Sequence, residues 1–336
     1  MKITMLGRLA AVLAAGVFAV GAASAEEFTM KLSSPTINDV VHEWMKTFKA
    51  GVESRSGGRI KVEIYPASQL GQIPRTVEGV ALGTIEMTLP ASGFLVSLEP
   101  RFQVFDAVGV FNDMRHAMRV LNDEDIRKRL ATFGADKGVE PLSILVNSPN
   151  ALLSHKPVRA LADLTGQKIR VPGGTPLNIE PFKKLGASPI SMPLGEVLPA
   201  LQNHTIDGLV AAATVYTAFK YYDIAKGLTY LPSSFLFVPA LVNRNFMKSL
   251  GPDLGAIVRE EARKADAVVS TWGVEDFERT RKTWEQHGGE NITLPPAEAK
   301  RFIDEVTGVM VPILSANPQI KADYEAFLAA AKKHRQ

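Results

Sequence analysis

The feature of this sequence that most constrains its fold is an alternation of strand and helix patterns. Apolar and polar side chains alternate over residues 28–32, as they do in a strand, and apolar side chains recur at helical spacing over residues 41–52. A Ser-Gly-Gly break at 56–58 ends this helix, and residues 60–64 alternate again. Repeated βαβ units of this kind predict a mostly parallel sheet whose two faces are covered by helices.

The alternation continues along the chain and then restarts, which predicts a second α/β lobe. The first run contains a helix opened by Pro74, a strand at 84–89, a helical stretch at 113–133 and an apolar strand at 139–146. After 147–157 the predicted segments are the strand that carries Arg170, a helix at 176–185, a strand near Ile190, a helix at 195–203, a strand at 206–210 and a strand at 235–242 that can return to the first lobe.

Residues 252–286 form one long helical pattern, which at 1.5 Å per residue corresponds to about 50 Å of helix. No single small lobe needs that length, so we expect this helix to brace both lobes. Residues 294–336 predict two further amphipathic helices and a basic tail. The predicted domains are a first lobe of residues 26–148 plus 237–275, and a second lobe of residues 149–236 plus 276–336 that includes the C-terminal helices.

The N-terminus predicts export. Lys2 and Arg8 precede an apolar run at 9–20 and the small residues Ala23-Ser24-Ala25, so residues 1–25 are expected to be a signal peptide cleaved after Ala25. The chain has no cysteine, which excludes disulfides, a thiol nucleophile and thiolate metal sites. Without Lys2 and Arg8 the net charge falls from +3 to +1, and such a balanced surface does not predict a nucleic-acid partner. No later stretch is apolar enough to cross a bilayer.

Motifs of catalysis and cofactor binding are missing from the sequence. It has no Gly-x-Ser-x-Gly elbow, P-loop, Gly-x-Gly-x-x-Gly turn or His-Glu-x-x-His motif. The six histidines are scattered, with no pair at helical spacing, and the acidic residues do not cluster as metal ligands do. We therefore expect no enzyme, no cofactor and no metal.

One arginine occupies a position suited to anion binding. The strand at 167–171 leads into a Pro-Gly-Gly turn, after which Thr175 and Pro176 have the residue types of an N-cap and a first helical position. Junctions of this kind hold ligands in open α/β sheets. Because a guanidinium can grip a carboxylate with two parallel hydrogen bonds, Arg170 is the leading candidate for a carboxylate-binding residue.

Several motifs in the same order resemble those of the periplasmic solute-binding proteins of TRAP (tripartite ATP-independent periplasmic) transporters, DctP type. They comprise residues 58–71 (GRIKVEIYPASQLG), 78–87 (EGVALGTIEM), 163–172 (DLTGQKIRVP) and 196–208 (EVLPALQNHTIDG). The resemblance implies a two-lobe, type II-like periplasmic binding protein with β-strand hinges and a long helix spanning both lobes. It also implies that an organic acid is held between the lobes by Arg170 and delivered to a two-part membrane permease. We expect a periplasmic monomer that is not itself embedded in the membrane.

The sequence departs from the family pattern where relatives carry polar groups. The position of a second arginine in the sialic-acid branch is Asn150 here, and a glutamate and an asparagine of the family fall on Val210 and Ala211. Such groups decide whether ligand hydroxyls are accepted, because an unpaired buried polar atom is costly. We therefore expect a monocarboxylate with an apolar or aromatic body. The candidate ligand-binding residues are Arg170, Asn150, Thr175, Tyr216, Phe94, Phe219, Phe237 and Gln72.

Each of these assignments has an alternative in ordinary structure. Arg170 could be a solvated arginine on an edge strand, the four aromatic residues could pack in the core, Asn150 could satisfy a turn, and Thr175 could serve as an N-cap alone. Two alternative functions also remain open. One is the binding protein of an ATP-driven (ABC) importer for a carboxylate, and the other is an exported enzyme that acts on a carboxylate.

Overall fold

The computed structural model describes residues 28–335, so the predicted signal peptide and the cleavage site after Ala25 lie outside the described residues. The strands are β1 (Phe28–Ser33), β2 (Ile60–Tyr65), β3 (Met87–Thr88), β4 (Val139–Ser154), β5 (Lys168–Val171), β6 (Ser188–Ser191), β7 (Gly208–Ala212), β8 (Gly227–Asn243) and β9 (Glu290–Thr293). The α-helices are α1 (Val40–Arg55), α2 (Ile73–Leu82), α3 (Met114–Leu121), α4 (Glu124–Leu130), α5 (Pro176–Lys184), α6 (Leu194–Gln202), α7 (Ala213–Ala218), α8 (Arg244–Ser249), α9 (Gly251–Gln286), α10 (Pro296–Ser315) and α11 (Pro318–Lys333). Two short 3-10 helices, η1 (Ser92–Phe94) and η2 (Pro100–Asp106), lie between β3 and α3.

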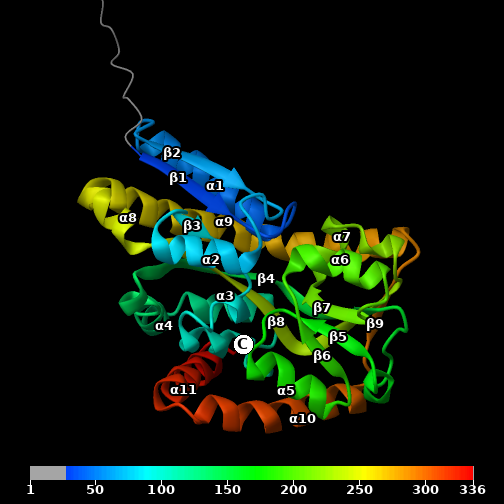
Figure 1. Ribbon diagram of the computed structural model, residues 1–336. Coiled ribbons are helices and arrows are strands. Elements are labelled where there is room, and N and C mark those ends of the chain that lie inside the picture. Colours follow the sequence, from blue (N-terminus) through cyan, green and yellow to red (C-terminus); the bar gives the residue numbers. More distant parts are fainter. Residues whose placement is uncertain (1–27, 336) are drawn as a thin grey trace, which may run out of the picture.

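The strands form one mixed sheet in the order β2-β1-β3-β8-β4-β7-β5-β6, with β9 beside β8. The pairs of β1 with β2 and β3 and of β5 with β6 and β7 are parallel, as the βαβ pattern predicted, whereas β4 and β8 pair antiparallel along their length. These two long strands run from the β1–β3 part of the sheet into the β5–β7 part (Figure 1). The predicted two-lobe α/β fold is confirmed, and β4 and β8 connect its lobes.

The strand β4 is longer than the sequence predicted. The polar segment at 147–150 has the composition of a turn, but β4 continues through it to Ser154. The pairing with β8 shifts register between Val146 and Pro149 and again between Pro149 and Ala151. Bulges of this kind let a strand accommodate a proline and change direction without ending.

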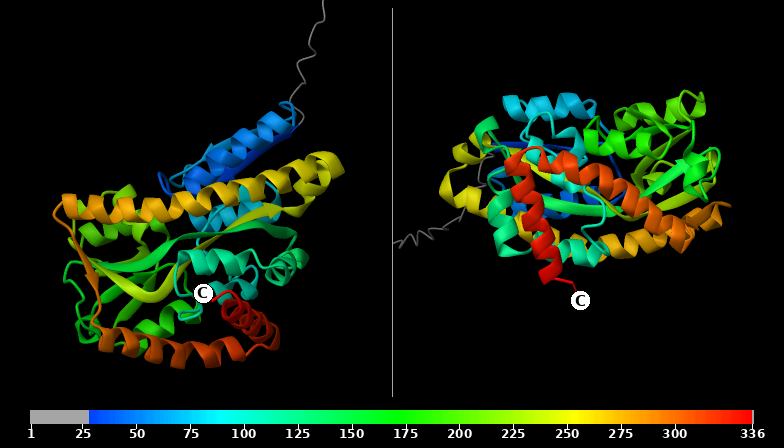
Figure 2. Two further views of the ribbon diagram at one scale, coloured as in Figure 1. Left: turned by 180° about the vertical axis from the view of Figure 1, so that it is seen from behind. Right: turned by 90° about the horizontal axis from the view of Figure 1, so that it is seen from below.

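The long helix predicted from residues 252–286 is present as α9, whose 36 residues correspond to about 54 Å. It packs against α1 in the first lobe and against α7 and β9 in the second. Figure 2 shows α9 running along the molecule past both lobes. Small residues permit this close packing, since a Cβ on Gly273 would lie 3.1 Å from Cγ2 of Val40.

The predicted helical stretch at 113–133 is divided into α3 and α4. The division occurs at Asp123, whose carboxylate accepts hydrogen bonds from the N–H groups of Asp125 and Ile126 and so caps α4. The C-terminal helices are both present. α10 packs against α5. α11 was assigned to the second lobe from the sequence, but it packs against η2, α3 and α4, whose residues were assigned to the first lobe.

The apolar residues form two buried clusters, which include Phe105, Phe111 and Phe237 in one and Trp44, Phe48 and Tyr216 in the other. Among the described residues, no helix combines the length and the apolarity that crossing a membrane requires.

Candidate functional site

Arg170 lies in β5, on the strand-to-helix junction that the sequence predicted. Thr175 caps α5 by accepting a hydrogen bond from the N–H of Asn178, and Pro176 is the first helical residue. The strand itself pairs with β6 and β7 on its two sides, so Arg170 is not on an edge strand. Its side chain is only 2% exposed. The alternative of a solvated arginine on an edge is thus excluded.

The partners of Arg170 are backbone oxygens. Nε donates to the carbonyl of Met192 at 3.0 Å, and a terminal nitrogen donates to the carbonyl of Val210 at 2.9 Å. Within the described chain no carboxylate forms an ion pair with this guanidinium. Burial lowers the pKa of Arg170 to about 10, so the group remains a cation at neutral pH. A buried cation without a counter-ion is costly, and its position suits an anionic ligand.

Arg170 faces a small cavity between the lobes, with a volume of about 30 Å³. Because a water molecule needs 10–15 Å³ of such volume, the cavity has room for two or three waters. Its apolar lining residues are Pro35, Ile73, Leu89, Ala91, Phe94, Pro172, Leu194, Ala211, Val215, Leu236 and Val238. Arg170 is the one charged residue of the lining, and the polar lining residues are Thr36 and Asn147.

The polar groups beside Arg170 are already engaged with the protein. The side-chain amide of Asn147 donates to Asp39 at 3.0 Å, and its oxygen accepts from the hydroxyl of Thr214 at 2.7 Å. The hydroxyl of Thr36 lies 3.1 Å from that of Ser34. Asp39 is fully buried, and burial raises the pKa of its carboxyl group. These contacts leave Arg170 as the principal group able to bind a ligand's charge.

A second small cavity, of about 40 Å³, shares the lining residues Pro172 and Leu236 with the first. It contains Asn150, whose amide donates to Ser234 at 3.0 Å while its buried Oδ1 has no partner. A buried acceptor without a donor indicates a missing water or ligand group. Val210, at a position where the family resemblance implied a polar residue, also lines this cavity.

Asp106 is a residue of the second cavity that the sequence analysis missed. It accepts hydrogen bonds from Ser92 at 3.0 Å and from Asn178 at 3.1 Å, and the Thr175 hydroxyl lies 3.5 Å away. Burial raises the pKa of its carboxyl group to about 7. The signal that could have found it is the presence of a single carboxylate in the apolar segment 102–111. Asp106 joins the end of η2 to the N-terminus of α5, across the cleft.

The other predicted ligand residues fall into two groups. Phe94 lines the Arg170 cavity, Thr175 lines an open cavity at the mouth of the cleft, and Gln72 lies in the contact between the lobes with its buried Oε1 unpartnered. Tyr216, Phe219 and Phe237 line none of these cavities. The hydroxyl of Tyr216 lies 2.8 Å from the backbone oxygens of both Ala151 and Leu209, and Phe237 packs between the rings of Phe105 and Phe111.

The two lobes touch through glycines. A Cβ on Gly93, in η1, would lie 2.5 Å from the carbonyl oxygen of Pro172, and a Cβ on Gly173 would lie 2.7 Å from the backbone of Gly93. Likewise, a Cβ on Gly195 would lie 2.5 Å from the side-chain amide of Gln72. Backbones approach this closely only where Cβ atoms are missing. The cleft is therefore closed around the small cavity at Arg170.

The carboxylates beside the two small cavities are engaged within the protein. Asp106 lines the second cavity, and Asp39 binds Asn147 of the Arg170 cavity. Both carboxylates are held by hydrogen bonds to neighbouring side chains. Over residues 28–335, no group of three or more histidine or acidic side chains could hold a metal ion. The geometry supports binding of an anion between the lobes.

Comparisons with known proteins agree with this geometry. Residues 33–314 match the family model DctP, described as bacterial extracellular solute-binding protein, family 7. The 2,3-diketo-L-gulonate-binding periplasmic protein of Escherichia coli (strain K12) is 29% identical over 267 residues, which cover 79% of this chain and 80% of that protein.

Two solved structures have the same fold. The sugar acid binding protein of Advenella mimigardefordensis in complex with galactonate has a TM-score of 0.86 and 23% identity, covering 92% of this chain and 99% of that one. The TRAP periplasmic solute binding protein of Desulfovibrio salexigens with bound orotic acid has a TM-score of 0.85 and 22% identity, covering 91% and 99%. The family predicted from the sequence motifs is confirmed. The chain belongs to the DctP family of bacterial extracellular solute-binding proteins, family 7.

Proposed function

We propose that this protein is the periplasmic solute-binding subunit of a TRAP transporter, which captures a small organic acid between its lobes and delivers it to a membrane permease. The observation that carries this proposal is the environment of Arg170, a buried cation whose hydrogen bonds within the described chain go to backbone carbonyls, in an otherwise mainly apolar cavity. A ligand carboxylate would supply the missing counter-charge. The relatives named above bind acids too: diketogulonate, galactonate and orotic acid.

We further propose that the ligand is a monocarboxylate with an apolar or aromatic body. The lining beside Arg170 is aliphatic apart from Phe94, Thr36 and Asn147, and the last two side chains are engaged with protein partners. A hydroxyl-rich sugar acid would bury several polar groups against this lining without partners, which costs about 1–3 kcal/mol for each group. The unpartnered oxygen of Asn150 offers room for one hydrogen-bond donor at the far end of the ligand.

A thermal-shift screen tests this proposal. The compounds are aromatic, aliphatic, 2-oxo, dicarboxylic and sugar acids, together with the uncharged amide of each. Because a ligand that binds only the folded state stabilises it by RT ln(1 + [L]/Kd), a cognate acid at 100 times its Kd should stabilise the protein by about 2.7 kcal/mol. We expect stabilisation by apolar monocarboxylates and none by their amides. Equal stabilisation by an acid and its amide would contradict the role of Arg170, and preference for sugar acids would contradict the apolar body.

Closure around the ligand is tested by Gly93→Ala. The added Cβ would lie 2.5 Å from the carbonyl oxygen of Pro172 and 2.7 Å from the amide nitrogen of Asn178, so the lobes cannot reach the contact described here. Overpacking of this kind costs about 1–3 kcal/mol, which corresponds to weakening of ligand binding by about 5- to 150-fold. Calorimetric titration with the best acid of the screen measures the effect.

Gly308→Ala is the matched control, because a Cβ at this helical position in α10 has no atom within 4 Å. Its affinity should equal that of the wild type. If Gly93→Ala also bound the acid as tightly as the wild type, closure through this contact would not contribute to binding.

A further inference from the structure

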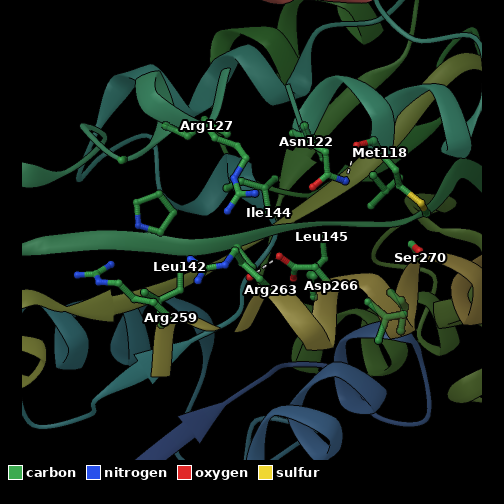
Figure 3. A pocket seen from close by; sticks show the side chains of 18 residues that line it. Met118, Asn122, Arg127, Leu142, Ile144, Leu145, Arg259, Arg263, Asp266 and Ser270 are labelled. Atoms are coloured by element: carbon green, nitrogen blue, oxygen red, sulfur yellow. Dashed lines mark hydrogen bonds between the residues drawn. The ribbon is translucent and has the colours of Figure 1, made fainter. Parts of the chain in front are cut away.

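A larger cavity, of about 200 Å³, lies away from the interlobe site, between α3, α4, β4 and α9. It shares no lining residue with the two cavities near Arg170. At 10–15 Å³ for each water, it has room for roughly 13 to 20 water molecules. Figure 3 shows Met118, Asn122 and Arg127 above the strand β4 and Arg259, Arg263 and Asp266 below it.

Three arginines line this cavity, and the side chains of two of them have no hydrogen-bonded or ion-paired partner among the described residues. Arg259 pairs with Glu140 outside the cavity. By contrast, the exposed side chains of Arg127 on α4 and Arg263 on α9 form no ion pair or hydrogen bond with another described residue, and the opposite charge that they attract is the carboxylate of Asp266. Arg263 lies one helical turn beyond Arg259 on α9, and Arg127 lines the same cavity from α4.

The one carboxylate of the lining, Asp266, attracts both Arg127 and Arg263 and can offset at most one of their two charges. Asp266 accepts a hydrogen bond from the indole N–H of Trp44 at 2.8 Å and another from the hydroxyl of Ser143 at 3.0 Å. Burial raises the pKa of its carboxyl group to about 6, which weakens its negative charge further in mildly acidic solution. Arg127 and Arg263 therefore face the cavity with an excess of positive charge.

The cavity also faces an open strand edge. Six consecutive residues of β4, 141–146, line it, and since side chains alternate between the two faces of a strand, the cavity lies along the edge of β4. β8 pairs with one edge of β4, while β7 pairs with the other edge only from Asn150 onward. Backbone N–H groups on this edge have no strand partner in the described chain and can donate to an anion.

We propose that this cavity binds a small oxyanion, a phosphate or a carboxylate, between Arg127 and Arg263. Guanidiniums bind both groups through paired charge-assisted hydrogen bonds. The bound anion joins α4 to α9, and so fastens the long helix to the first lobe at a point independent of the transported ligand.

Calorimetric titration of the full chain with inorganic phosphate and with succinate, in Tris-chloride at constant ionic strength, tests this site and distinguishes the two sources of oxyanion. We expect one of the two to bind with a Kd of about 1 mM or below. Arg127→Gln and Arg263→Gln should each weaken that binding by about tenfold or more, because each removes a hydrogen bond to a charged group. Arg170→Met should leave it unchanged, which separates this site from the interlobe cleft.

Arg115→Gln is the matched control, because it removes an exposed arginine of α3 that does not line the cavity. Because salt screens an exposed charge, Arg115→Gln should bind the oxyanion within about twofold of the wild-type affinity. Equal losses in Arg115→Gln and Arg127→Gln would overturn the proposal in favour of a diffuse surface field. Loss of binding in Arg170→Met alone would place the oxyanion in the cleft. Absence of binding by both anions would also overturn it, leaving the arginines as charges that protect an open strand edge from pairing.

Discussion

Replacement of Arg170 by methionine is expected to weaken binding of the cognate acid by roughly 30-fold to several thousand-fold. This range corresponds to the 2–5 kcal/mol that is typical when one member of a buried, hydrogen-bonded charge pair is removed. Methionine is long enough to occupy most of the space of the arginine, so the change removes the charge without opening a large cavity. Calorimetric titration with the best acid from the ligand screen gives the measurement.

The same substitution should not destabilise the ligand-free protein. Arg170 is 2% exposed and contacts the carbonyls of Met192 and Val210 but no carboxylate. Its burial therefore opposes folding, and an apolar replacement should leave the free energy of unfolding unchanged or raise it. A loss of affinity together with unchanged or increased stability is specific to a ligand-binding charge. Misfolding would lower both.

Two further variants sharpen this test. Arg170→Lys keeps the charge but loses the planar fork, so its affinity should fall between those of the wild type and Arg170→Met. Arg159→Met removes an exposed arginine of the same lobe, whose side chain pairs with Glu290, and should bind as the wild type does. If Arg170→Met retained full affinity, the ligand carboxylate would have to bind elsewhere.

The sequence was sufficient to predict the parts of the fold that depend on local pattern. The helix α9 was predicted almost to its ends, since its apolar residues recur at helical spacing over ten turns. The strand-to-helix junction that carries Arg170 was predicted because a strand, a glycine turn and an N-cap follow one another in sequence. Both predictions use residues that are neighbours in the chain.

Other parts of the site depend on strand faces and could not be predicted in the same way. Phe237 was a candidate wall, yet Leu236 and Val238 line the cavity while Phe237 points to the opposite face of β8. Adjacent strand residues face opposite sides, so an error of one position exchanges cavity and core. The register shift in β4 around Pro149 changes which residues of β4 lie opposite those of β8. No local sequence pattern reveals this shift.

Contacts between segments that are distant in the chain could not be predicted from the sequence either. Asp106 meets Asn178, which lies 72 residues later, and Gly93 meets Gly173 across the cleft. Single carboxylates and glycines are common in any chain. Only the arrangement of the two lobes shows that these particular ones hold the cleft closed.

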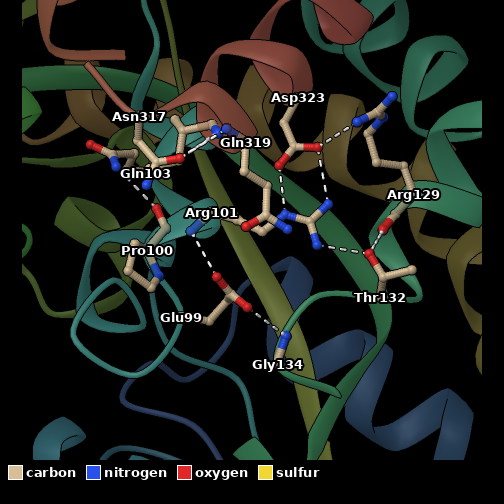
Figure 4. Close-up of polar contacts among 11 residues, drawn as sticks. Glu99, Pro100, Arg101, Gln103, Arg129, Thr132, Gly134, Asn317, Gln319 and Asp323 are labelled. Carbon is tan, nitrogen blue, oxygen red and sulfur yellow. Dashed lines mark hydrogen bonds and ion pairs between the residues drawn. The ribbon is translucent and has the colours of Figure 1, made fainter. Parts of the chain in front are cut away.

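The ionic cluster at Asp323 is another long-range example, since Arg101 and Asp323 are 222 residues apart, and its loss is expected to be strongly destabilising. Asp323, on α11, is fully buried and accepts hydrogen bonds from Arg101 at 2.6 and 3.0 Å and from Arg129 at 2.8 Å (Figure 4). Arg101 also donates to the hydroxyl of Thr132 at 2.8 Å, and its guanidinium lies 4.0 Å from the centre of the Phe133 ring. This cluster attaches the C-terminal helix to η2 and α4.

Asp323→Asn should lower the free energy of unfolding by about 3–5 kcal/mol, because it leaves the buried Arg101 without its counter-charge. In a chain of this size the melting temperature should fall by roughly 5 to 10 °C. Urea unfolding followed by circular dichroism measures the change. Glu290→Gln, which breaks the exposed pair with Arg159, is the control and should cost less than about 1 kcal/mol.

A double variant separates the charge from the packing. Arg101→Met with Asp323→Leu removes both charges and keeps apolar volume, so it should recover most of the stability lost in Asp323→Asn. Since Asp323 lies outside the interlobe cavities, Asp323→Asn should bind the acid normally at temperatures well below its transition. If the double variant were no more stable than Asp323→Asn, the cluster would act through its hydrogen-bond geometry, and the cost assigned here to an unpaired buried arginine would be wrong.

Arg170 and Arg101 are both buried guanidiniums of one chain, and they differ in what neutralises them. Arg101 has its carboxylate within the fold, whereas Arg170 has none among the described residues, and we propose that the ligand supplies it.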